Sequence, residues 1–205
     1  MSANFRDNLS KMIGVLRSVG LNDILAFDIE TFSPNGFPKR FEDPVVNFSV
    51  VTPLGGRGVI SLSVIGSWNL EEAMLSLLHE LFSGFRGASL LTYNGARFDL
   101  EYVAERGSLY GLGFNDVFSE LHHIDVYRVV KWLNIRLLKR DQKSVERRLG
   151  LSRSISWISG YNYHESYMRF LRFGNLEPML YNLEDSYGCL RIASALSRRI
   201  TGGRR

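Results

Sequence analysis

Two carboxylate side chains end an apolar run near the beginning of the chain, in the stretch ILAFDIET at residues 24–31. Asp28 and Glu30 are two positions apart, so on a β-strand both point to the same face. Two negative charges held this close repel one another, and burial makes an unpaired ion still more costly. Divalent cations such as Mg²⁺ and Mn²⁺ remove this repulsion because they prefer carboxylate oxygens. The pair therefore indicates a metal site, unless both acids lie past the strand end in water.

Two further acids occur in comparable settings. Asp99 follows a second apolar run, in LLTYNGARFDLEYV, at the expected start of a helix, where an N-terminal helix charge is its alternative role. Asp185 lies in an otherwise apolar helix, in LYNLEDSYGCL, and Tyr181 precedes it by four residues on the same helical face. An Asp on a core-facing stripe is seldom unpaired. The combined set predicts a site where two metal ions clamp a phosphodiester for attack by water: Asp28, Glu30, Asp99, Asp185 and Tyr181.

Hydrophobic periodicity predicts the elements that position these residues. Strands are expected at 24–30, 45–52, 58–65, 88–94 and 122–127. Helices are expected at 3–19, from Asn69 through Phe82, at 98–106, from the end of the strand at 122–127 through Trp132, at 143–150, and from Glu177 to Arg199. A loop is expected at 152–163. The first three strands are joined by hairpin-like connections. The order therefore predicts an α/β fold in which a mixed sheet is flanked by helices.

Three motifs and the segments between them resemble a known family. FDIETFSPNGFP with the later DPVVNFSVV, then LTYNGARFDLEYV, and finally YNLED are similar to the three motifs of DEDD-superfamily 3′–5′ exonucleases of the tyrosine branch. HIDVYRVVKW and KSVERRLGL resemble the segments between the second and third motifs. The resemblance extends from about residue 24 to 196, and is closest to the exonuclease domain of family B DNA polymerases. It implies a ribonuclease H-like fold whose first three strands are antiparallel.

The resemblance also implies roles in catalysis. Asp28 would bridge two Mg²⁺ or Mn²⁺ ions, Glu30 and Asp185 would complete the first site, and Asp99 would support the second. Tyr181 would orient the attacking water, because a tyrosine with a pKa near 10 is a poor base at neutral pH.

Four more positions match residues that hold the nucleic acid in that family. Asn94 and Phe98 would contact the single-stranded 3′ end, although Phe98 could instead belong to the core. Thr31 and Phe32 would lie beside the terminal nucleotide.

The basic residues are concentrated in the second part of the chain. Residues 1–127 hold 9 basic and 15 acidic residues, whereas residues 128–205 hold 16 basic and 6 acidic ones. This asymmetry favours a polyanionic partner, and the segment 128–153 either follows the substrate, binds a partner or forms a solvated helix face. Aromatic residues alternate with arginines at 152–173, which suits single-stranded nucleic acid, although at least half of these aromatics are expected in a helix core. His122 and His123 precede Asp125, which is interpreted as structural.

Length and composition set the remaining expectations. The 205 residues predict an N-terminal amphipathic helix at 1–20, a possible docking element for a partner protein, and one exonuclease domain at 21–205. There is no apolar window long enough for a membrane span, no signal peptide and only one cysteine, Cys189, so a cytoplasmic protein is expected. No room remains for a polymerase domain before Arg205, which indicates a stand-alone nuclease or a subunit.

Two classes of function remain open. The first is a metal-dependent 3′–5′ exonuclease on single-stranded DNA, with the same chemistry on RNA as its close alternative. It could act alone or within a replication or repair complex. The second is a catalytically silent subunit that binds nucleic acid; the presence of all four acids and the tyrosine disfavours it.

Overall fold

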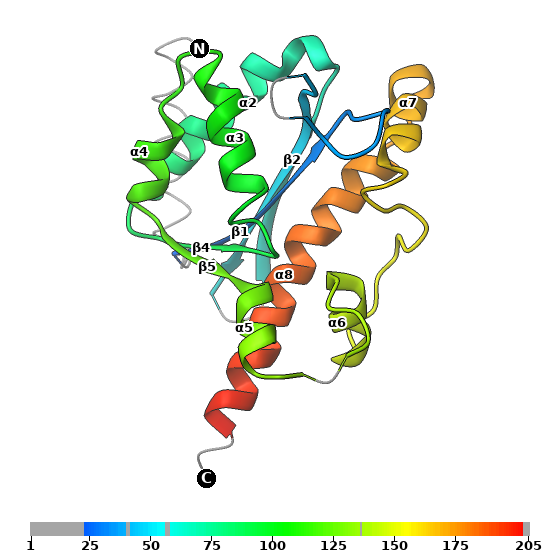
Figure 1. Cartoon of the computed structure of the whole chain (residues 1–205). Coiled ribbons are helices and arrows are strands. Elements are labelled where there is room, and N and C mark those ends of the chain that lie inside the picture. Colours follow the sequence, from blue (N-terminus) through cyan, green and yellow to red (C-terminus); the bar gives the residue numbers. More distant parts are fainter. Residues whose placement is uncertain (1–22, 40–41, 56–57, 136, 203–205) are drawn as a thin grey trace.

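A mixed five-stranded sheet forms the centre of the computed structural model, which describes all residues except 1–22, 40–41, 56–57, 136 and 203–205 (Figure 1). The strands are β1 (Ile24–Thr31), β2 (Val45–Leu54), β3 (Gly58–Ile65), β4 (Ser89–Thr92) and β5 (His122–Asp125). Their order across the sheet is β3-β2-β1-β4-β5. β1 pairs antiparallel with β2, and β2 with β3, whereas β4 runs parallel to both β1 and β5. The predicted antiparallel beginning and mixed sheet are confirmed.

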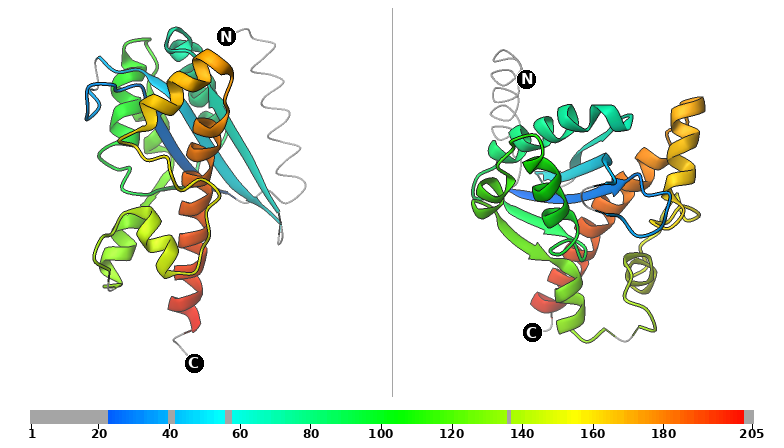
Figure 2. Two further views of the ribbon diagram at one scale, coloured as in Figure 1. Left: turned by 90° about the vertical axis from the view of Figure 1, so that its right-hand side faces the viewer. Right: turned by 45° about the horizontal axis from the view of Figure 1, so that its top comes forward.

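Helices cover both faces of this sheet (Figures 1 and 2). The connecting elements are η1 (Trp68–Leu70), α2 (Glu71–Ser83), α3 (Asp99–Ser108), α4 (Phe114–Ser119), α5 (Val126–Trp132), α6 (Gln142–Arg148), α7 (Tyr163–Phe173) and α8 (Glu177–Gly202). α8 runs along one face of the sheet with α5 and α6 beside it, and α2, α3 and α4 lie on the other face. Among the described residues, no helix is both long and apolar enough to cross a membrane.

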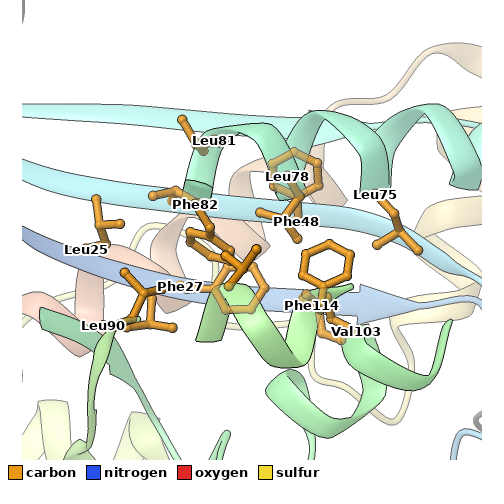
Figure 3. Packing of buried hydrophobic residues seen from close by; sticks show 14 of the residues in the cluster. Leu25, Phe27, Phe48, Leu75, Leu78, Leu81, Phe82, Leu90, Val103 and Phe114 are labelled. Carbon is orange, nitrogen blue, oxygen red and sulfur yellow. The ribbon is translucent and has the colours of Figure 1, made fainter. Parts of the chain in front are cut away.

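The alternation of side chains along β1 divides the core between the two faces. Leu25 and Phe27 pack toward α2, where the rings of Phe27 and Phe82 meet edge to face with centroids 5.1 Å apart (Figure 3). Ala26 points to the opposite face and packs with Cys189 and other apolar residues of α8. Asp28 follows Ala26 by two positions, so the same alternation turns it toward α8.

The predicted elements differ from the structure mainly at their ends. The strand expected at 122–127 ends at Asp125, because the Asp125 carboxylate accepts the Tyr127 N–H at 3.0 Å and caps α5. α4 was not predicted, since its six residues are too few to show a helical period. The N-terminal helix expected at 1–20, with its proposed docking role, lies outside the described residues, and so does the start of the domain expected at 21–205.

Candidate active site

Three carboxylates converge between β1 and α8. One oxygen from each of Asp28, Glu30 and Asp185 lies within 4.8 Å of the others. Asp28 and Glu30 reach this point because they share one face of β1, and an irregularity in the β1–β2 register falls between Glu30 and Thr31. Asp185 comes from the buried stripe of α8, which Cys189 continues. The structure thus brings together three of the four acids predicted to hold metal.

Asp99 lies beside this group of three rather than within it. It is the first residue of α3 and is buried, and its Oδ1 accepts the backbone N–H of Ile29 at 3.2 Å. Ile29 lies between Asp28 and Glu30 in β1, so this hydrogen bond attaches the fourth carboxylate to the strand that carries the first two. Asp99 is close enough to raise the pKa of both through charge repulsion.

The electrostatics of the site favour bound protons or cations. Burial raises the pKa of Asp28 and of Glu30 well above their usual values, and the neighbouring carboxylates raise both further. Burial likewise raises the pKa of Asp99 to about 7, although its backbone hydrogen bonds oppose the shift. At neutral pH these acids can therefore all ionise only if positive charge compensates them. Carboxylate oxygens gathered in this way fit Mg²⁺ or Mn²⁺, the hard cations that oxygen ligands select.

Two polar side chains that the sequence analysis missed organise these acids. Asn182 is fully buried, and its Nδ2 donates to Oδ2 of Asp28 at 2.7 Å. Arg153 donates to the Asp185 carboxylate and also to Glu146, which is buried on α6. Asn182 Oδ1 and Arg153 Nη1 are buried without a hydrogen-bond partner among the described groups.

Signals for these residues were present in the sequence. Asn182 is a polar residue in the apolar stretch that carries Tyr181, and Glu146 directly follows the apolar Val145 of α6. Arg153 and Asp185, however, are far apart in the sequence, and no motif or periodicity relates the two positions.

Tyr181 lies in a tyrosine-rich cluster next to the carboxylates. It is buried, and its ring centroid lies 6.1 Å from that of Tyr163. Burial first, and then the charges of Asp185 and Glu30, raise its pKa well above the usual value, and its hydroxyl hydrogen-bonds Asp185. Lys143 Nζ lies 5.0 Å from the centre of the Tyr181 ring. The hydroxyl therefore stays protonated at neutral pH and can act as a hydrogen-bond donor, not as a base.

The four residues predicted to bind nucleic acid lie in different settings. Thr31 is buried and its hydroxyl is 2.8 Å from that of Ser33. Phe32 is partly buried and stacks on Trp68 with ring centroids 5.6 Å apart. Asn94 is exposed and adopts a left-handed conformation with φ of 62°. Phe98 is partly buried and packs against the core, whereas its contact with nucleic acid stays a prediction.

The remaining candidates take structural positions. Asp125 accepts the N–H of Asn94 at 2.9 Å and thereby supports the left-handed turn, and His123 hydrogen-bonds Thr92 at 2.9 Å. Among the described residues, neither His122 nor His123 belongs to a group that could hold a metal ion. Of the aromatic residues at 152–173, Tyr163 and Tyr167 are buried and Phe170 packs against their cluster, whereas Trp157, Tyr161 and Phe173 are exposed.

The mixed sheet, the α8 crossing and the carboxylates at their junction define a ribonuclease H-like fold with an exonuclease-type acidic cluster. The chain belongs to the RNase H superfamily, whose family profile matches residues 25–197. The fold expected from the sequence motifs, and their resemblance to the exonuclease domain of family B DNA polymerases, are confirmed.

Sequence comparison finds similarity to DNA polymerases. The DNA polymerase delta catalytic subunit of Candida albicans is 32% identical over 116 residues, which are 49% of this chain and 11% of that protein. The DNA polymerase catalytic subunit of Equine herpesvirus 2 (strain 86/87) is 29% identical over 126 residues, 53% of this chain and 12% of that protein. The chain thus spans only a small part of the length of these relatives.

Solved structures show the same fold. The family B DNA polymerase from the hyperthermophilic archaeon Pyrobaculum calidifontis superposes with a TM-score of 0.70 at 23% identity, over 84% of this chain and 24% of the polymerase. Exonuclease I superposes with a TM-score of 0.59 at 14% identity, over 86% of this chain and 40% of that protein.

Proposed function

We propose that this protein is a metal-dependent 3′–5′ exonuclease that hydrolyses phosphodiester bonds at the 3′ end of single-stranded nucleic acid, with DNA preferred over RNA. It would act alone or as a subunit of a replication or repair complex. The observation that carries the proposal is the convergence of Asp28, Glu30 and Asp185 within 4.8 Å, with Asp99 attached to the same strand.

The carboxylates would hold two Mg²⁺ or Mn²⁺ ions, with Asp28 between them and Asp99 toward the second. When bound, these ions supply charge neutralisation for the phosphodiester and for the attacking and leaving oxygens. The raised pKa values of Asp28 and Glu30 support this assignment, because a site that repels its own charges gains most from a cation.

The chain's own polar groups would orient the reactants. The protonated Tyr181 hydroxyl donates to Asp185, so its oxygen would accept a hydrogen bond from the attacking water and fix the position of that water. Arg153 holds the Asp185 carboxylate in place for the metal. Asn182 holds Asp28 in one orientation, which keeps the carboxylate ready for the metal.

The residues around the site would hold the 3′ end as a single strand. Phe98 meets the exposed ring of Phe37 edge to face with centroids 6.0 Å apart, and aromatic faces of this kind stack on unpaired bases. The exposed Asn94 side chain would contact the strand, and Thr31 and Phe32 would lie beside the terminal nucleotide. The preference for DNA rests on the resemblance to the catalytic subunits of DNA polymerases.

Digestion of single-stranded DNA and RNA of matched sequence, labelled at the 5′ end, tests the proposal. With Mg²⁺ or Mn²⁺ the labelled strand is expected to shorten stepwise from its 3′ end, faster for DNA. Asp28→Ala should abolish the ladder, and Asp116→Ala, an exposed aspartate of α4, should retain it. Binding of both strands without cleavage by the wild type would instead indicate a silent nucleic-acid-binding subunit.

A further inference from the structure

A basic groove lies on the surface of α6, away from the carboxylates. It has a volume of about 580 Å³ and is lined by Leu137, Leu138, Lys139, Ser144, Arg147 and Arg148. Arg147 and Arg148 are exposed, and Leu138 is fully exposed. Three positive side chains and an apolar surface thus share one concave site that the proposed chemistry does not use.

The two sides of α6 connect this groove with the candidate active site. Because a helix turns once in 3.6 residues, Gln142 and Glu146 share one side, and Arg147 and Arg148 point away from it. Gln142 Nε2 donates to the backbone carbonyl of Asp185 at 2.7 Å, and Glu146 binds the Arg153 guanidinium that also holds Asp185. The basic groove therefore lies on the far side of the helix that supports a proposed metal ligand, roughly one helix diameter of 10–12 Å away.

The acids near the groove leave most of its charge uncompensated. Asp141 caps α6 by accepting the backbone N–H and the hydroxyl of Ser144, both at 2.9 Å, and its carboxylate lies near Lys139. Glu146 is buried against Arg153 on the other side. Among the residues that the structure describes, neither Arg147 nor Arg148 makes an ion pair. These two guanidinium groups are thus free to bind an anion.

We propose that the basic groove binds the phosphates of a single-stranded nucleic acid a few nucleotides on the 5′ side of the bond that is cut. This inference rests on the proposed function, since it assigns a path to the strand whose 3′ end enters the carboxylate site. A single strand carries one phosphate charge per nucleotide, to which the three cations of the groove are complementary, and the exposed Leu138 offers an apolar surface to its bases. A strand must pass around α6, so the two sites are separated by more than the roughly three nucleotides that span one helix diameter at the 3.4 Å spacing of stacked bases.

Two charge-removing variants and a matched control test the proposal. Arg147→Gln and Arg148→Gln each remove one positive charge and keep a good helix former in α6. The control, Arg86→Gln, also removes one positive charge, but just before the start of β4, whereas Asn94 and Asp99 follow the other end of that strand. The substrates are a strand of about 20 nucleotides, long enough to reach the groove, and a trinucleotide that fills only the carboxylate site. Thermal unfolding of each variant shows that it is folded.

For the long strand, we expect KM to rise roughly tenfold when both arginines are replaced, with kcat unchanged, because each lost phosphate contact weakens binding. The slope of log affinity against log salt should fall by about 0.7 for each arginine removed. Trinucleotide hydrolysis and the Arg86→Gln variant should behave as the wild type. The proposal would be overturned if the arginine substitutions affected both substrates equally, or if Arg86→Gln had the same effect as they do. An unchanged KM and salt slope would also overturn it, and would favour an acidic protein partner for the groove.

Binding separates this proposal from the proposed function. Fluorescence anisotropy of the labelled long strand with the Asp28→Ala variant, with and without the two arginine substitutions, measures the groove without any cleavage. If no metal supports hydrolysis by the wild type, the exonuclease proposal fails, yet an arginine-dependent affinity would still support strand binding in the groove.

Discussion

Asn182 and Asp28 are 154 positions apart and are joined by a hydrogen bond of 2.7 Å between the amide Nδ2 and the carboxylate Oδ2. The bond ties α8 to β1 at the point where the acids converge. Because the Asn182 side chain is fully buried, it has no freedom to turn away. Asp28 is thereby held in one orientation before any cation arrives.

Replacing Asn182 with Ala should weaken metal activation. Loss of a hydrogen bond that orients a metal ligand typically costs about 10–100-fold in metal affinity or activity. The Mn²⁺ concentration that gives half-maximal nuclease activity should therefore rise at least about tenfold. Asn115→Ala, at an exposed position of α4, is the matched control. An unchanged metal requirement for Asn182→Ala would show that Asp28 is positioned by other means.

Replacing Asp28 with Asn should abolish activity and yet stabilise the metal-free protein. The neutral amide keeps the size of the side chain and removes one charge from a group of mutually repelling acids. Because the substitution removes this repulsion and a buried charge, the Tm of the metal-free variant should be higher than that of the wild type. Thermal unfolding in EDTA measures this difference. A lower Tm for the variant would contradict the assignment of repulsion at the site.

The metal-free protein should lose stability as the pH rises from about 4 to 7. The pKa of Asp99 is about 7 in the folded state and near its usual low value in the unfolded state, so between these values the folded state binds more protons. Stability is therefore greatest below the unfolded pKa and declines as the pH passes through the folded value. Asp28 and Glu30 act in the same direction.

Unfolding in EDTA at pH 5 and pH 8, repeated with Mn²⁺, checks this pH dependence. The Tm in EDTA should be higher at pH 5, and Mn²⁺ should restore stability mainly at pH 8, where the carboxylates are ionised. A metal-free protein that is more stable at pH 8 would contradict the raised pKa values.

The sequence predicted the backbone of this site better than its hydrogen-bond network. Asp28 and Glu30 could be placed on one face of β1 because strand periodicity is local, and the i, i+4 spacing of Tyr181 and Asp185 placed both on one helical face. The pairing of Arg153 with Asp185 could not be predicted, since it depends on how α6 and the following loop pack on α8. The same holds for Asn182, because it reaches its partner Asp28 only where α8 crosses β1 in the folded protein.

Removing the Arg153 side chain should strongly destabilise the protein. Its guanidinium is buried between Glu146 and Asp185, so Arg153→Met leaves two acids without their cation. Breaking a buried ion pair from one side costs about 3–5 kcal/mol. Chemical unfolding measures the loss, and the double variant Arg153→Met with Glu146→Gln should recover part of it. If Arg153→Met unfolds like the wild type, Arg153 does not compensate these acids in solution.

Gly188→Ala tests whether α8 must leave room for the Glu146 carboxylate. A Cβ at Gly188 would overlap Oε1 of Glu146 and lie 2.7 Å from Nε2 of Gln142, so the substitution must displace these two side chains of α6. Alanine is favoured over glycine by roughly 1 kcal/mol within a helix, but crowding in a packed interior costs about 1–3 kcal/mol. We expect a net loss of stability together with reduced nuclease activity, because the displaced Glu146 no longer holds Arg153 against Asp185. Gly160→Ala, where a Cβ meets no atom within 4 Å, should leave both unchanged. A Gly188→Ala protein that is more stable and fully active would show that these two side chains of α6 can shift without disturbing the carboxylates.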